Sequence, residues 1–145
     1  MNWSKIIGAL PPGQTALLVQ HCHGAAGVIN CLADFPENSL WSLSGLLNAA
    51  AELTWTAGPL AKGPGLCHGN AGNGYAFLKM YGRTQDEKWL NRARKFAMHA
   101  IKQSTLAAKE YGQYRHSLWT GDLGLAVYLW DCVRGTPQFP TMDVF

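Results

Sequence analysis

The chain has 145 residues, of which 48% are hydrophobic and 14% charged, and its formal net charge is +3. This length suits one domain, and the scattered basic residues argue against nucleic-acid binding, which needs a dense basic face. No apolar run approaches the roughly 18 residues of a membrane-spanning helix. The chain start lacks the charged lead and long apolar run of a signal peptide, so we expect a cytoplasmic protein with reduced cysteines.

Three segments repeat one pattern, in which two glycines three residues apart accompany a short apolar run. They cover residues 22–29, 67–74 and 119–126, and their first glycines are 45 and 52 residues apart. Periods of this size are typical of solenoids or closed arrays of helical hairpins. Glycines at this spacing share one helical face and let another backbone approach closely.

Longer helices are predicted between the repeats. Residues 41–55 carry an apolar face, with Asn38 or Ser39 as a cap and Gly58-Pro59 as the end. Residues 86–109 carry a second apolar stripe, and the acidic pair Asp86-Glu87 suits the amino end of that helix. The members of the second stripe are Trp89, Leu90, Ala93, Phe96, Ala97, Ala100 and Ile101. Strand signals are almost absent, so the predicted fold is all-α.

Two of the three repeats begin with Cys-His-Gly, and the third has Trp-Thr-Gly instead. If equivalent positions face a shared centre, Cys22 and Cys67 converge. Two cysteines and one histidine would leave a tetrahedral zinc ion with one open position, which suits a further thiolate. The residues alone do not choose between His23 and His68, and His21 also flanks Cys22. The competing interpretation is two ordinary buried cysteines.

The remaining cysteines, Cys31 and Cys132, lie within apolar helical runs. We expect both of them to be core residues rather than metal ligands.

The first two motifs, within residues 20–27 and 65–78, resemble the zinc-binding part of lanthionine synthetase C-like proteins. The third motif, residues 117–124, and the ending, residues 139–143, resemble the close of the same family's chain. The resemblance implies an α/α toroid of helical hairpins. Residues 1–145 would form its carboxy-terminal segment and supply about three hairpins of seven.

The resemblance also implies roles for individual residues. Zinc would be held by Cys22, Cys67 and His68, with His23 near the site as a non-ligand. Lys62 matches a lysine that contacts glutathione in one branch of the family, and Arg115 is a second candidate for that role. A solvated surface charge is the competing interpretation for both basic residues.

Members of the family join a thiol to dehydroalanine or dehydrobutyrine and form a thioether. The thiol is a peptide cysteine in bacterial cyclases and glutathione in the eukaryotic-type branch, to which this sequence looks closer. The expected partners are therefore glutathione or a peptide thiol and a dehydrated peptide or protein, and open edges of the partial ring predict self-association.

Two departures from the family's pattern favour a function without catalytic turnover. His21 stands where the family usually has tryptophan, and the family's acid/base residues come from hairpins ahead of this segment. His21 and His23 are the nearest candidates for a general acid, but neither is assigned. The alternatives are a zinc- and glutathione-binding protein without turnover, or an inactive fragment. A sugar-active toroid needs two carboxylates across its cleft and ranks last.

Overall fold

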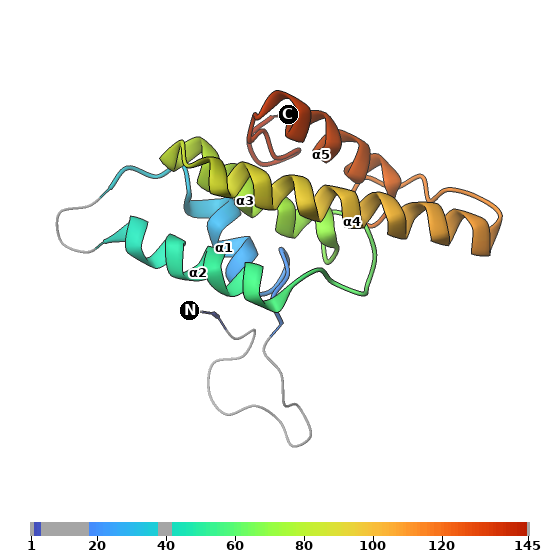
Figure 1. Cartoon of the computed structure of the whole chain (residues 1–145), viewed down its shortest axis with the longest axis horizontal. Helices are drawn as coiled ribbons and strands as arrows, with labels where there is room; N and C mark the ends of the chain where they lie inside the picture. The colour runs from blue at the N-terminus through green and yellow to red at the C-terminus, as the bar shows by residue number, and fades with distance from the viewer. Residues whose placement is uncertain (1, 4–17, 38–41, 145) are drawn as a thin grey trace, which may run out of the picture.

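The computed structural model describes residues 2–3, 18–37 and 42–144. Over these residues the fold contains five α-helices and no strand, which confirms the all-α prediction (Figure 1). No helix in these ranges has both the length and the apolar character needed to cross a membrane. The helices are α1 (Ala25–Leu32), α2 (Leu43–Ala57), α3 (Asn70–Thr84), α4 (Glu87–Tyr111) and α5 (Asp122–Arg134).

Helix α3 is the centre of the molecule. Every residue from Asn70 to Met80 is buried, and α3 contacts all four other helices. Helices α1 and α2 form one hairpin, α3 and α4 form a second, and α5 packs on α3 and α4. The described part of the chain therefore holds two complete hairpins and one further helix, which agrees with the expected partial array of about three hairpins.

A serine caps the start of α2, and a glycine ends it. Ser42 caps α2, because its side-chain oxygen accepts a main-chain N–H of the first turn at 2.9 Å. Gly58 ends the helix with φ of 75°, as predicted. The predicted start at Trp41 and the predicted caps Asn38 and Ser39 lie outside the described residues.

The long outer helix α4 matches its predicted range closely. Asp86 caps it, and six of the seven residues of the predicted stripe are buried. The exception is Ile101, which is 37% exposed. It lies at the side of the stripe, between the buried residues Ala100 and Ser104.

The prediction that both remaining cysteines are core residues is wrong for one of them. Cys132 is buried, whereas Cys31 is exposed. The buried face of α1 contains Ala25, Ala26 and Ile29, and a residue two positions after Ile29 points about 200° away from it.

The repeated glycines allow a close approach, but by each helix's own preceding loop rather than by another helix. A methyl carbon added to the second glycine of each motif would lie 2.0, 1.8 or 2.1 Å from a main-chain oxygen six residues earlier in the chain. The three glycines are Gly27, Gly72 and Gly124, and the oxygens belong to His21, Leu66 and Leu118. Any larger residue would push the loop away from the helix.

Helix α5 presents an apolar face that the described residues leave open to solvent. Leu123, Val127, Trp130 and Val133 are between 37% and 75% exposed and follow a helical spacing. This is the kind of open edge from which self-association was expected, and that association stays a prediction.

Candidate metal centre

The three repeated motifs meet through their main chains. The N–H of Cys22 donates to the carbonyl of Cys67 at 3.0 Å, and the N–H of Cys67 donates to the carbonyl of Trp119 at 2.8 Å. These residues occupy the same position in the three repeats, three residues before α1, α3 and α5 begin. The repeat therefore brings together residues that are far apart in sequence.

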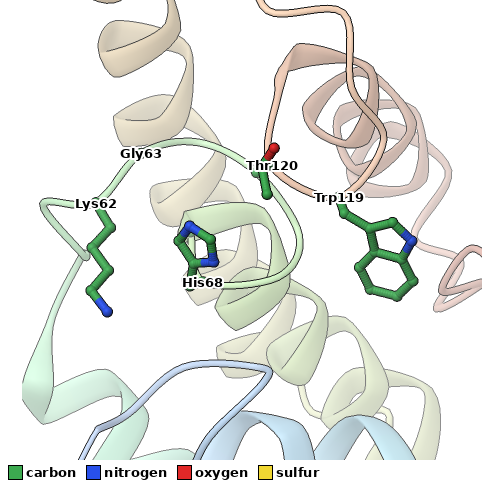
Figure 2. A pocket seen from close by; sticks show the side chains of 7 residues that line it. Lys62, Gly63, His68, Trp119 and Thr120 are labelled. Carbon is green, nitrogen blue, oxygen red and sulfur yellow. The ribbon is translucent and has the colours of Figure 1, made fainter.

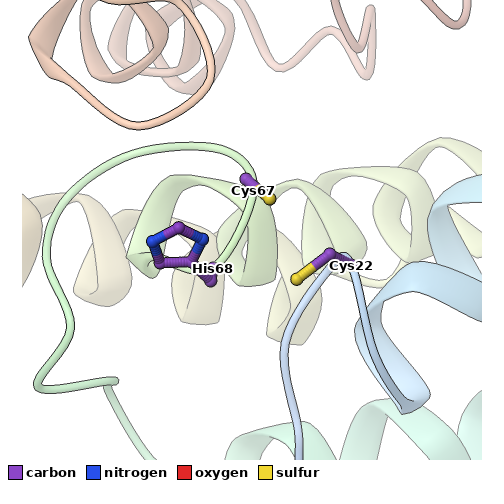
Figure 3. Close-up of side chains that lie close together, drawn as sticks. All are labelled: Cys22, Cys67 and His68. Carbon is purple, nitrogen blue, oxygen red and sulfur yellow. The ribbon is translucent and has the colours of Figure 1, made fainter. Parts of the chain in front are cut away.

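Cys22, Cys67 and His68 form a compact group of metal-binding atoms. Their two sulfurs and a ring nitrogen all lie within 4.8 Å of one another, and the three side chains come from two adjoining loops (Figure 3). Bond lengths of about 2.0–2.3 Å in a tetrahedron place zinc ligands roughly 3.3–3.8 Å apart. The group therefore fits a zinc ion after small adjustments, and three protein ligands leave the fourth position free.

The electrostatics of the loops favour a cation between the thiols. Burial raises the pKa of Cys67, and the neighbouring Cys22 raises it further, while the positive charge of Lys62 lowers it. A bound cation would remove the cost of bringing two thiolates together.

The two histidines beside Cys22 have different surroundings. The ring of His21 stacks on Phe139 with centroids 4.6 Å apart, its Nδ1 lies 3.0 Å from Nδ2 of Asn30, and burial lowers its pKa. His21 is thus a neutral packing residue, which suits its place where the resembling family has an aromatic tryptophan. His23 is exposed, and its Nδ1 lies 3.2 Å from Sγ of Cys22.

A small, partly open pocket adjoins one of the candidate ligands, His68. The space inside it, open solvent included, is about 160 Å³. Figure 2 shows Lys62 and His68 on one loop and Trp119 and Thr120 on another. The lining residues are Lys62, Gly63, Gly65, His68, Gly69, Trp119 and Thr120.

The two basic residues predicted to bind substrate differ in their placement. Lys62 lines the pocket, and its Nζ donates to Oε1 of Gln20 at 3.1 Å. Arg115 is exposed and is not among the pocket residues. Its main chain instead holds the start of α5, because its N–H and its carbonyl both bond to Asp122, at 2.6 and 2.8 Å.

One residue close to the site had no role in the sequence analysis. Gln20 is only 4% exposed, and its Nε2 donates to Sγ of Cys22 at 3.1 Å. In the sequence, Gln20 is visible only as a polar residue two positions before Cys22, inside the first motif. Nothing in the sequence indicates that its side chain is buried.

The fold and the site define a class: helical hairpins whose inner helices begin at a Cys/His cluster. The family described as lanthionine synthetase C-like protein matches residues 1–144. The chain belongs to this family, which confirms the resemblance.

Two relatives show how much of such a protein the chain covers. It is 36% identical over 132 residues to the protein named glutathione S-transferase LANCL1 from Danio rerio, covering 88% of this chain and 32% of the relative. It is also 36% identical over 136 residues to LanC-like protein GCL1 from Arabidopsis thaliana, covering 88% of this chain and 30% of the relative. The chain thus spans about a third of the length of these relatives.

Proposed function

We propose that Cys22, Cys67 and His68 bind one zinc ion and that the site activates a thiol, with glutathione as the favoured substrate. The observation that carries the proposal is the convergence of two sulfurs and a ring nitrogen within 4.8 Å. The name of the Danio rerio relative, a glutathione S-transferase, supports the choice of thiol.

The proposed reaction adds the thiol to dehydroalanine or dehydrobutyrine. When bound, zinc would supply an electron-poor centre that keeps an incoming thiol, as its fourth ligand, deprotonated at neutral pH. The sulfur would form a bond to the β-carbon as the carbon–carbon double bond breaks, and the α-carbon would receive a proton. The product is a thioether.

The chain's own residues would orient and shield the thiol. Trp119 and Thr120 line the same pocket as His68, from a second loop (Figure 2). The ammonium of Lys62 would attract a carboxylate of glutathione. His23 is the one histidine beside Cys22 whose ring is exposed, so it is the candidate proton donor on this chain.

Zinc analysis of the purified full chain tests the metal site. We expect about one zinc per chain in the wild type and a loss of most zinc in Cys22→Ala and Cys67→Ala. Cys31→Ala is the matched control, because this exposed thiol is not part of the cluster. Unchanged zinc content in both ligand variants would refute the proposal.

A second function, thiol binding without turnover, needs only the same three ligands. Mass spectrometry of a dehydroalanine peptide incubated with glutathione and the zinc-loaded chain separates the two. A thioether product above the background without protein indicates catalysis. Glutathione binding without product indicates the second function.

A sugar-active site finds no support at the third motif. Both carboxylate oxygens of Asp122 already accept hydrogen bonds, one from the Ser104 hydroxyl and one from the main-chain N–H of Arg115. This carboxylate is therefore committed to holding the start of α5.

A further inference from the structure

Gln20 lies between a candidate metal ligand and the pocket lysine. Its main chain is fixed by two reciprocal bonds with His23, at 3.0 and 3.2 Å, and its side chain is buried. The loop that follows Val19 is also tied to α3, because Nδ2 of Asn73 donates to the Val19 carbonyl at 2.9 Å. The position of the Gln20 side chain is therefore set by the fold.

The two ends of the Gln20 amide have different partners. Nζ of Lys62 lies 3.1 Å from Oε1, and Sγ of Cys22 lies 3.1 Å from Nε2. An ammonium group can only donate hydrogen bonds, so the amide oxygen must face Lys62 and the NH₂ group must face the sulfur. The contact with the cation polarises the amide and strengthens the donor at its other end.

We infer that Gln20 is a positioning residue that couples the metal ligand Cys22 to the substrate-binding Lys62. This inference rests on the proposed zinc and thiol function. The amide N–H orients the Cys22 sulfur toward the other ligands, and the amide oxygen holds the ammonium at the mouth of the pocket. Groups of this kind, which bond to a ligand rather than to the metal, commonly change metal affinity 10–100-fold when they are removed.

Substitutions at Gln20 separate its two contacts. Gln20→Leu has a similar size and loses both. Gln20→Glu keeps an acceptor for Lys62 but loses the donor to Cys22. Lys62→Met loses only the lysine contact. Gln85→Leu is the control, because this exposed glutamine also makes two side-chain hydrogen bonds, both to main-chain oxygens at the end of α3.

Zinc affinity, measured by competition with a chromophoric chelator, gives the first result. We expect about a tenfold or greater weakening in Gln20→Leu and in Gln20→Glu, and less than a threefold change in Gln85→Leu. Thermal melting identifies any variant that fails to fold. If Gln20→Leu does not fold, Gln20→Glu still tests the contact with Cys22.

Calorimetric titration with glutathione at saturating zinc gives the second result. We expect weaker binding in Gln20→Leu and in Lys62→Met, and a smaller loss in Gln20→Glu, which still holds the lysine. If the wild type takes up zinc but Gln20→Leu and Gln20→Glu match Gln85→Leu in both measurements, the inference is overturned while the proposed function stands. If the wild type takes up no zinc, both fall.

Discussion

Substitution of Gly72 by alanine tests how the inner helix holds the candidate metal site. Gly72 lies in the buried part of α3, and an added methyl carbon would lie 1.8 Å from the carbonyl oxygen of Leu66. A relaxed carbon–oxygen contact is about 3.3 Å, so helix and loop must separate by about 1.5 Å. The obstacle is main chain, and no side-chain rotation relieves it.

The expected magnitude combines two opposing effects. Overpacking a buried site costs about 1–3 kcal/mol, and alanine recovers up to about 1 kcal/mol over glycine within a helix. Because the contact is with main chain, the cost falls at the upper end of that range, and we expect a net loss of about 2 kcal/mol in the free energy of unfolding, or about 6 °C in the melting temperature. Leu66 directly precedes Cys67, so the shift also exceeds the roughly 0.2 Å tolerance of metal–ligand distances. Zinc affinity should fall at least tenfold.

Gly82→Ala is the matched control in the same helix. Gly82 is exposed, and the nearest neighbour of its added methyl is the side chain of Pro137, at 2.8 Å, which must shift slightly. Alanine at position 82 gains the same helix propensity but does not contact the loop that carries Leu66 and Cys67. Urea denaturation and zinc competition are measured on both variants. If Gly72→Ala is as stable and binds zinc as tightly as Gly82→Ala, the role assigned to the motif glycines is refuted.

Three other predictions concern the core and the metal. Iodoacetamide should modify the exposed Cys31 within minutes in the folded chain but should spare Cys132, because burial raises the pKa of Cys132 to about 11. Equal rates of modification of the two thiols in the folded chain, without urea, would contradict this. Lys79→Met should lower the free energy of unfolding by about 1 kcal/mol, because it removes the 1% exposed ammonium and leaves the carboxylates of Asp34 and Asp143, which are 65% and 23% exposed, in contact with water. Asp143→Asn should cost more than Lys79→Met, because it leaves the buried ammonium with the exposed Asp34 alone. Urea melts measure both costs, and a smaller cost for Asp143→Asn would contradict this. Chelation of zinc should lower the melting temperature yet preserve helical circular dichroism at 25 °C, because main-chain bonds already join the motif loops; loss of the helical signal would contradict this.

Much of the fold could be predicted from the sequence because helices follow local periodicity. The apolar stripe of residues 86–109 predicts α4 to within two residues at its carboxyl end, and the Gly58 stop predicts the end of α2. The repeated Cys-His-Gly motif predicts that Cys22 and Cys67 meet, because equivalent positions of a repeat face a common centre. Their binding of zinc stays a prediction.

Other features depend on which surfaces pack together, and local patterns do not encode that. Cys31 sits in an apolar run, yet the rotation of α1 against α3 leaves it exposed. His21 could have been a ligand by sequence, but Phe139, which is remote in the chain, covers its ring.

The sequence by itself determined the helices, the repeat and the residue types of the metal cluster, because these depend on spacing along one chain. Only the tertiary structure decided that the buried amide of Gln20 lies between Cys22 and Lys62, because Gln20 and Lys62 are 42 residues apart in the chain. Such a contact forms because α3 holds both loops at its amino end, and that geometry arises only when the helices pack.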